Sequence, residues 1–239
     1  MKRQGLILGI IALVIIGIGV SLAISSKPDS KQPGQTVDSQ SLIRSSSQMT
    51  GKPDAKVQLI EFGDFQCPAC AYAEPILEKV IEEYKDKNFN FVFRNFPLSQ
   101  HKNAMIAAES AESAAKQGKY WEYHNKLYAS QQEWSEAQNA RDFFEQYAKD
   151  LGLNMDEFNT DLDKHNLKLL IDQDIQDGTA IGVNSTPTLY LNGQKLDKIY
   201  TFEEFKSAID SILNDTASTS VNDNASSTPS DDDQVNPFQ

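Results

Sequence analysis

The hydrophobic pattern of the chain predicts an α/β fold whose helices are concentrated in the middle. Four short runs have the pattern of β-strands, namely residues 57–62, 89–93, 188–191 and 195–200. Each shows apolar content, alternation of apolar and polar residues, or flanking turn residues. The last two are joined by Asn192–Gly193, a dipeptide typical of a type I′ hairpin. Residues 71–84 and 202–213 show the spacing of amphipathic helices, and Thr201 with Glu204 matches an N-terminal capping box.

The region between the second and third predicted strands is helical throughout. From residue 103 to residue 178, aromatic and aliphatic side chains recur at helical spacing. These stripes indicate a packed core and not a cofactor or peptide site. We assign His124 and His165, which lie within them, to the core or the surface.

The N-terminal end of the chain has the pattern of a membrane anchor. Residues 5–24 are twenty residues without a charge, which is long enough to span a bilayer. Lys2 and Arg3 precede them and favour a cytoplasmic N-terminus. We therefore expect a cytoplasmic segment at 1–4 and an uncleaved transmembrane signal anchor at 5–24. A signal peptide cleaved near Ser25 is the alternative, although the apolar run is longer than usual for one.

Polar segments flank the part of the chain that can build a core. Residues 25–52 are rich in Ser, Gln, Lys and Pro and predict a flexible linker. Residues 214–239 are rich in Ser, Thr, Asn and Asp and predict a disordered acidic tail. One folded domain is left at 53–213, which is long enough for a full core. The net charge of −12 argues against a nucleic-acid partner.

The candidate chemistry lies in the two cysteines of the chain, Cys67 and Cys70. They follow the first predicted strand and open the first helix, with Cys67 at the N-cap and Pro68 at the first helical position. Free backbone N–H groups and the helix dipole favour an anion there, which can bring a thiol pKa from about 8.5 to roughly 3.5–7.5. Cys70 is one turn further on the same face, within reach of a disulfide. We expect Cys67 to be an exposed nucleophile and Cys70 a shielded resolving thiol.

Two other roles are open to such a pair of cysteines. A structural disulfide here would close a four-residue ring, which constrains little chain and therefore stabilises little. Zinc would need two further ligands, and the three histidines of the chain include no closely spaced pair. Redox chemistry is the better interpretation, and we predict no metal.

Three motifs follow one another in the predicted α/β region. They are Glu61–Cys70 (EFGDFQCPAC), Pro75 five residues past the second cysteine, and Ser185–Thr188 (STPT). Their order and spacing resemble the DsbA-like extracytoplasmic disulfide oxidoreductases of the thioredoxin superfamily. The resemblance covers roughly residues 56–213. It implies a thioredoxin fold into which an all-helical domain is inserted at about residues 100–178.

The resemblance also implies roles for individual residues. In this family the bond between Thr186 and Pro187 is cis and faces the disulfide, so both residues would bind substrate and tune the redox site. Glu61 matches a buried acid that exchanges a proton with the resolving thiol. Pro68 and Ala69 lie between the cysteines, where strong oxidases carry histidine in the second position. Without that cation we expect a higher nucleophile pKa and a weaker oxidant.

The resulting prediction is a single-pass bacterial cell-membrane protein with an extracytoplasmic catalytic domain. It would be a thiol:disulfide oxidoreductase, acting as a dithiol oxidase on exported proteins, with the Cys67–Cys70 disulfide in place of any other cofactor. Expected partners are unfolded or partly folded proteins with thiols, a membrane reoxidant and the membrane itself. Since no dimerisation domain is evident, we expect a monomer. A reductase or isomerase is the alternative, as is a non-enzymatic peptide-binding module on a thioredoxin scaffold.

Overall fold

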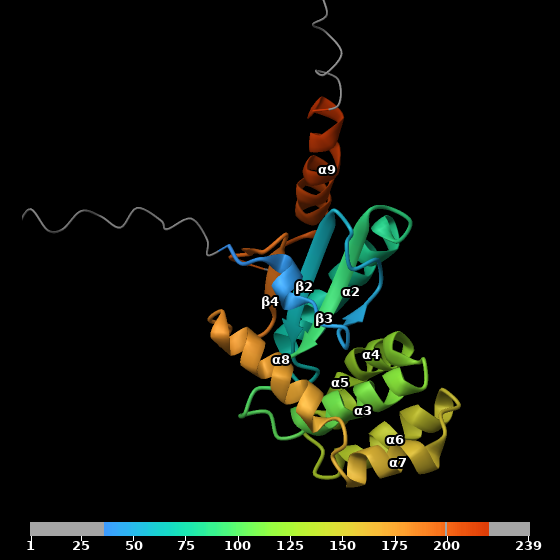
Figure 1. The fold of residues 1–239 in the computed structure, drawn as a ribbon. Helices are drawn as coiled ribbons and strands as arrows, with labels where there is room; N and C mark the ends of the chain where they lie inside the picture. Colours follow the sequence, from blue (N-terminus) through green and yellow to red (C-terminus); the bar gives the residue numbers. More distant parts are fainter. Residues whose placement is uncertain (1–35, 199, 220–239) are drawn as a thin grey trace, which may run out of the picture. The chain divides into compact units, whose positions relative to one another are not determined.

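The computed structural model describes residues 36–198 and 200–219, and within them five strands form one mixed sheet (Figure 1). The strands, in the order in which they lie side by side, are β1 (Gln48–Met49), β3 (Phe89–Asn95), β2 (Val57–Gly63), β4 (Thr188–Leu191) and β5 (Gln194–Lys195). β2 and β3 are parallel, and the other pairs are antiparallel. β2 therefore lies at the centre, which explains its continuous apolar run.

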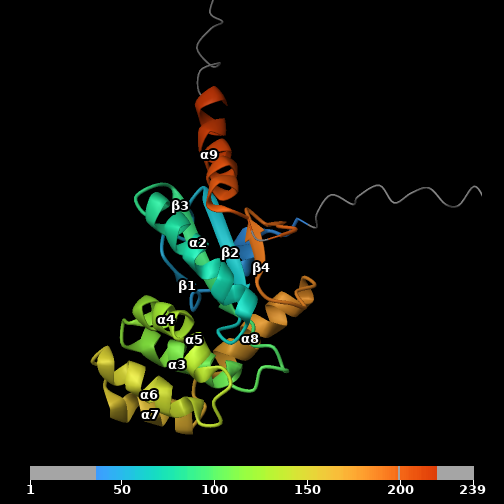
Figure 2. The ribbon, with the colours of Figure 1, turned by 180° about the vertical axis from the view of Figure 1, so that it is seen from behind.

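Helices account for most of the rest of the described chain. They are η1 (Ser39–Leu42), α2 (Pro68–Tyr84), α3 (Ala104–Lys116), α4 (Tyr120–Ala129), α5 (Gln131–Trp134), α6 (Ala140–Asp150), α7 (Met155–Asp163), α8 (Lys168–Ala180) and α9 (Phe202–Thr219). α2 links the parallel strands. α3 to α7 gather beyond one end of the sheet, and α8 leads the chain back to β4 (Figures 1 and 2). The α/β fold with a helical block between β3 and β4 agrees with the order of elements in the sequence.

Alternation along β2 decides which side chains meet which helices. Val57 and Leu59 face the core shared with α2, α9 and the helical block. Ile60 and Phe62 face a second core, built with the segment before β2 and with α8. Glu61 continues the first series, so the strand itself directs this carboxyl toward the face that α2 covers.

Two local signals in the C-terminal part are confirmed. Asn192 and Gly193 both have positive φ, 47° and 77°, as a type I′ turn requires. The Thr201 N–H donates to Oε2 of Glu204 at 2.8 Å, and the Glu204 N–H donates back to the Thr201 hydroxyl at 3.3 Å, which completes the capping box. The strand expected at 195–200 is shorter, because β5 ends at Lys195.

The linker prediction for 25–52 is wrong for its described part, residues 36–52. β1 pairs with β3, Leu42 is buried, and the Arg44 guanidinium donates to Asp177 at 2.6 Å. Scattered apolar residues among polar ones suffice here because they pack onto a sheet face that is already apolar.

The tail predicted to be disordered from residue 214 is helical in its described part. α9 continues to Thr219, since residues 214–219 include neither Gly nor Pro to end it. The predicted segments 1–4 and 5–24 and most of the tail lie outside the described residues. Within the described part, no helix is long and apolar enough to cross a membrane.

Candidate active site

The two cysteines lie where β2 leads into α2. Cys67 is the N-cap of α2 with extended backbone, and Pro68 occupies the first helical turn. Both cysteines are free thiols, with 6% of Cys67 and 1% of Cys70 exposed. The expectation of an exposed Cys67 needs correction, because its sulfur lies against the backbone of Thr186. The exposed residues of this turn are Pro68 and Ala69.

Cys67 is surrounded by groups that stabilise its anion. Hydrogen bonds to the Cys67 sulfur lower its pKa to about 5, although burial opposes them. The donors are the Cys70 thiol, the Thr186 hydroxyl and the backbone N–H groups of Cys70 and Ala69. In the thiol form, Sγ donates to the Thr186 carbonyl at 3.3 Å. The Thr186 hydroxyl then has no partner among the described residues, so it is available to the thiolate.

Cys70 has the opposite tendency. Burial, the hydrogen bond to the Cys67 sulfur and the charges of Glu61 and Cys67 raise its pKa well above the ordinary value of 9. One thiol of the pair therefore ionises below neutral pH while the other keeps its proton. This asymmetry is the arrangement that thiol–disulfide exchange needs.

Glu61 lies beneath the cysteines, as its place in β2 requires. It is 1% exposed, and its Oε2 atom has no hydrogen-bond partner within the described chain. Burial, followed by the charge of Cys67, raises the pKa of Glu61 to about 8. Glu61 is thus a neutral acid at pH 7 that interacts electrostatically with both cysteines.

Glu74 is a second buried acid, which the sequence analysis missed. It is 6% exposed, and burial, then the charges of Glu61 and Glu78, raise its pKa to about 9. Its Oε1 atom lies 3.4 Å from Nδ1 of His124 in α4. The available signal was its position one turn after Cys70 on the face of α2 that turns toward the core.

The histidines fit the assignments made from the sequence. His124 is buried among aromatic rings, and burial lowers its pKa to about 4, so it is neutral. The side chain of His165 is 65% exposed, and its Nδ1 atom lies 3.0 Å from Glu109. Among the described residues, no group of three or more His, Cys, Asp or Glu side chains is arranged to hold a metal ion.

The loop before β4 completes the site. The peptide bond between Thr186 and Pro187 is cis. Thr186 is buried against Cys67, while Ser185 is exposed. The structure thus brings together Cys67, Cys70, Glu61 and Thr186, which are spread over 126 positions of the sequence.

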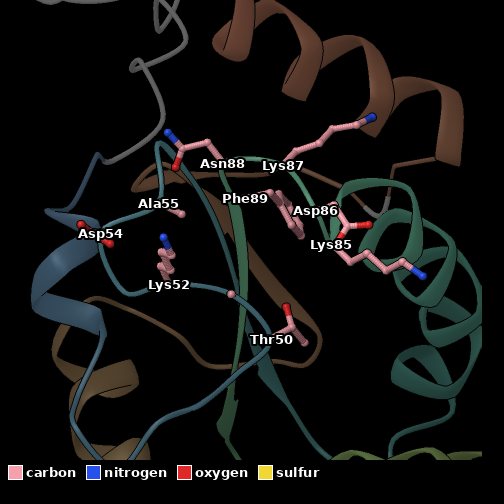
Figure 3. Close-up of a pocket in the computed structure, with 10 residues that line it drawn as sticks. Thr50, Lys52, Asp54, Ala55, Lys85, Asp86, Lys87, Asn88 and Phe89 are labelled. Atoms are coloured by element: carbon pink, nitrogen blue, oxygen red, sulfur yellow. The ribbon is translucent and has the colours of Figure 1, made fainter.

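Cavities of different character lie near and far from the cysteines. One of about 690 Å³ is lined by mixed charges, among them Lys52, Asp54 and Lys85 (Figure 3). It opens beside the C-terminal end of α2, roughly 25 Å along the helix from the thiols, so it does not belong to this site. A cavity of about 330 Å³ between Ala71 and α5 lies beside the start of α2.

Three features occur together: a low-pKa thiol at the N-cap of the helix that follows the central strand, a protonated second thiol one turn later, and a cis-proline loop against the first sulfur. They define a thioredoxin-fold thiol–disulfide oxidoreductase of the DsbA-like class. The chain belongs to the thioredoxin family, because the family model described as thioredoxin matches residues 45–211.

Comparison with relatives agrees with this class. A Bacillus cereus protein named probable disulfide bond formation protein D is 30% identical over 215 residues, which cover 87% of this chain and 95% of that protein. The Na(+)/H(+) antiporter NhaA 1 of Mycolicibacterium gilvum is 32% identical over 197 residues, or 79% of this chain. The chain spans only 30% of that antiporter's length.

Solved structures share the fold. Oxidised BdbD from Bacillus subtilis has a TM-score of 0.65 at 24% identity, covering 78% of this chain and all of that one. The α-DsbA1 protein of Wolbachia pipientis has a TM-score of 0.68 at 20% identity, covering 77% and 99%. At these identities the likeness concerns the fold alone.

Proposed function

We propose that the protein is an extracytoplasmic dithiol oxidase that introduces disulfides into exported proteins through Cys67 and Cys70. The observation that carries this proposal is the opposite pKa shift of the two thiols. A stabilised thiolate at Cys67 makes the reduced form of the pair favourable, and the Cys67–Cys70 disulfide therefore accepts electrons readily from other thiols.

The reaction begins with a substrate thiolate that attacks Sγ of Cys67 in the disulfide form. The Cys67–Cys70 bond breaks, its electron pair stays on Cys70, and a mixed disulfide forms between substrate and Cys67. Cys70 needs a proton, since its pKa is well above 9. Glu61 is buried beneath it and protonated at neutral pH, so it is the proposed donor.

The second step releases the product. Another substrate thiolate attacks the substrate sulfur of the mixed disulfide, and Cys67 leaves as a thiolate. A leaving group with a pKa of about 5 departs easily at neutral pH. Substrate gains one disulfide, and the enzyme retains two electrons as the dithiol.

Pro68, Ala69 and the cis-proline loop are proposed to contact the substrate. Ala69 and Pro68 are exposed beside the reactive sulfur. Because Pro187 has no N–H group, the neighbouring backbone groups are left free to pair with an extended substrate. The side chain of Ala69 carries no positive charge that could stabilise the Cys67 thiolate. A Cys67 pKa of about 5, above the value of about 3.5 known for DsbA, supports a weaker oxidant.

The cellular setting is part of the proposal. The uncharged run at 5–24 after Lys2 and Arg3 supports a single-pass anchor in a bacterial cell membrane with the thiols outside. Turnover then requires a partner that reoxidises Cys67 and Cys70, and an anchored monomer would meet a membrane reoxidant by diffusion in the same bilayer. A reductase or isomerase would instead need electrons delivered across the membrane.

The reduction potential of the pair tests the direction of the reaction. Equilibration with glutathione should give a value between about −120 mV, typical of DsbA, and about −200 mV, and the oxidised protein should oxidise a reduced, unfolded model protein stoichiometrically. A potential near the −270 mV or so of thioredoxin would refute the oxidase. The double variant Cys67→Ser/Cys70→Ser should lose all activity, whereas a peptide-binding module would keep its binding function.

A further inference from the structure

Gln131, the first residue of α5, belongs to the helical block but contacts the active-site turn. Its side-chain NH₂ group donates to the carbonyl oxygen of Phe65 at 2.7 Å and to that of Cys67 at 2.9 Å. Gln131 is buried, and both of its N–H donors are used in these two bonds. The Gln131 side chain therefore holds two backbone carbonyl groups in place, that of Cys67 itself and that of Phe65, two residues earlier.

Other amide side chains fix α5 against the same turn. The Gln66 side chain donates to the carbonyl of Ser135 at 2.7 Å, and its oxygen accepts the Asn103 N–H at 2.7 Å. The Asn103 side chain in turn donates to the carbonyls of Trp134 and Ser135. Because these groups are buried and bonded, the position of Gln131 relative to Cys67 is set by a connected network and not by one surface contact.

The Cys67 carbonyl has a particular place in this site. It accepts the Ala71 N–H at 3.2 Å as the first bond of α2, and it accepts Gln131 as a second donor. Fixing this carbonyl fixes the peptide plane after Cys67, and so the direction of the Ala69 and Cys70 N–H groups relative to Sγ. The amide donor also offsets part of the negative charge on the Cys67 carbonyl oxygen, which belongs to the same residue as the sulfur anion.

We propose that Gln131 is a positioning residue, through which the helical block holds the Cys67 peptide so that its sulfur faces the N–H groups at the start of α2. The inference rests on the proposed role of Cys67 as the nucleophile. It means that the redox poise of the cysteine pair is set partly by α5, more than sixty residues away in the sequence.

The test compares Gln131→Met with a matched control, Gln132→Met. Methionine keeps the length of the side chain and removes both donors. Gln132 is the next residue of α5, is exposed, and lines the same cavity, so its substitution repeats the chemical change without touching the turn. For each variant and the wild type we would measure three properties. They are the thiolate absorbance at 240 nm as a function of pH, the equilibrium with glutathione, and the urea unfolding of the oxidised and reduced protein.

Gln131→Met should raise the Cys67 pKa by about 0.5 to 1 unit, roughly a three- to tenfold smaller thiolate fraction below that pKa. Its disulfide should become less oxidising, and its reduced form should lose more stability than its oxidised form. Gln132→Met should match the wild type. A Gln131→Met protein with wild-type pKa and potential, or with equal stability loss in both redox states, would show a merely structural contact and overturn the inference.

A second measurement needs no substitution and covers the case that Gln131→Met fails to fold. In ¹⁵N-labelled wild-type protein, the side-chain NH₂ signals of Gln131 should shift with pH together with the Cys67 thiolate, while those of Gln132 stay fixed. Gln131 signals that do not follow the thiolate would contradict the proposal. A wild-type protein with no thiolate signal would refute the proposed function itself, and the inference with it.

Discussion

Replacing the buried acid Glu74 by glutamine should stabilise the protein, and the gain should grow with pH. Glutamine has the same shape but does not ionise. Burial, with the charges of Glu61 and Glu78, raises the Glu74 pKa from an ordinary 4.5 to about 9. Between these values the unfolded carboxyl is ionised and the folded one is protonated, so folding takes up a proton and stability falls as pH rises. At pH 7 the cost amounts to about 3.5 kcal/mol, since each pH unit above 4.5 adds about 1.4 kcal/mol.

Urea unfolding from pH 4 to pH 9 tests this reasoning. Both proteins are kept oxidised, so that neither cysteine titrates. The difference in unfolding free energy between Glu74→Gln and wild type should be small at pH 4 and then rise by up to about 1.4 kcal/mol per pH unit. Glu82→Gln, on the exposed side of the same helix and not among the charges that raise the Glu74 pKa, controls for the loss of a negative charge from α2. A difference that does not change with pH would refute the argument that burial keeps Glu74 protonated.

Three further predictions concern the thiol pair and the buried ion pairs. Alkylation of reduced protein by iodoacetamide should reach half its maximal rate near pH 5, and Cys67→Ser should abolish it. Ala69→His should lower the Cys67 pKa by about one unit and raise the reduction potential measured against glutathione. Arg94→Met should lower the unfolding free energy in urea by about 3–5 kcal/mol, because the buried guanidinium bonds Asp174 at 2.7 Å and Asp177 at 2.5 Å.

Local patterns in the sequence sufficed for the elements that carry the cysteines. The apolar run at 57–62 corresponds to β2, and the helical spacing at 71–84 corresponds to α2. The hairpin at Asn192–Gly193 and the capping box at Thr201 were predictable for the same reason, since each depends on residues within four positions of one another.

Contacts between distant segments were not predictable from one sequence. Residues 36–52 have a linker's composition, and only the apolar sheet face beneath them explains their order. The burial of Cys67 depends on Thr186, 119 positions later. Glu74 and Gln131 are ordinary polar residues in helical segments, and their importance follows from what the fold places beside them.

Burial and hydrogen bonding together determine how protons are distributed in the active site. Burial raises the pKa of Glu61, Glu74 and Cys70 alike, so at neutral pH all three keep their protons. Cys67 is also buried, but hydrogen-bond donors around its sulfur lower its pKa to about 5, so it becomes the anion. Because the Cys67 charge itself helps to keep Glu61 protonated, formation of the thiolate and storage of a proton beneath it are coupled. In the proposed reaction Cys67 carries no charge when Cys70 leaves the disulfide, so burial, the larger of the two causes, is what keeps on Glu61 the proton that Cys70 would take up at that step.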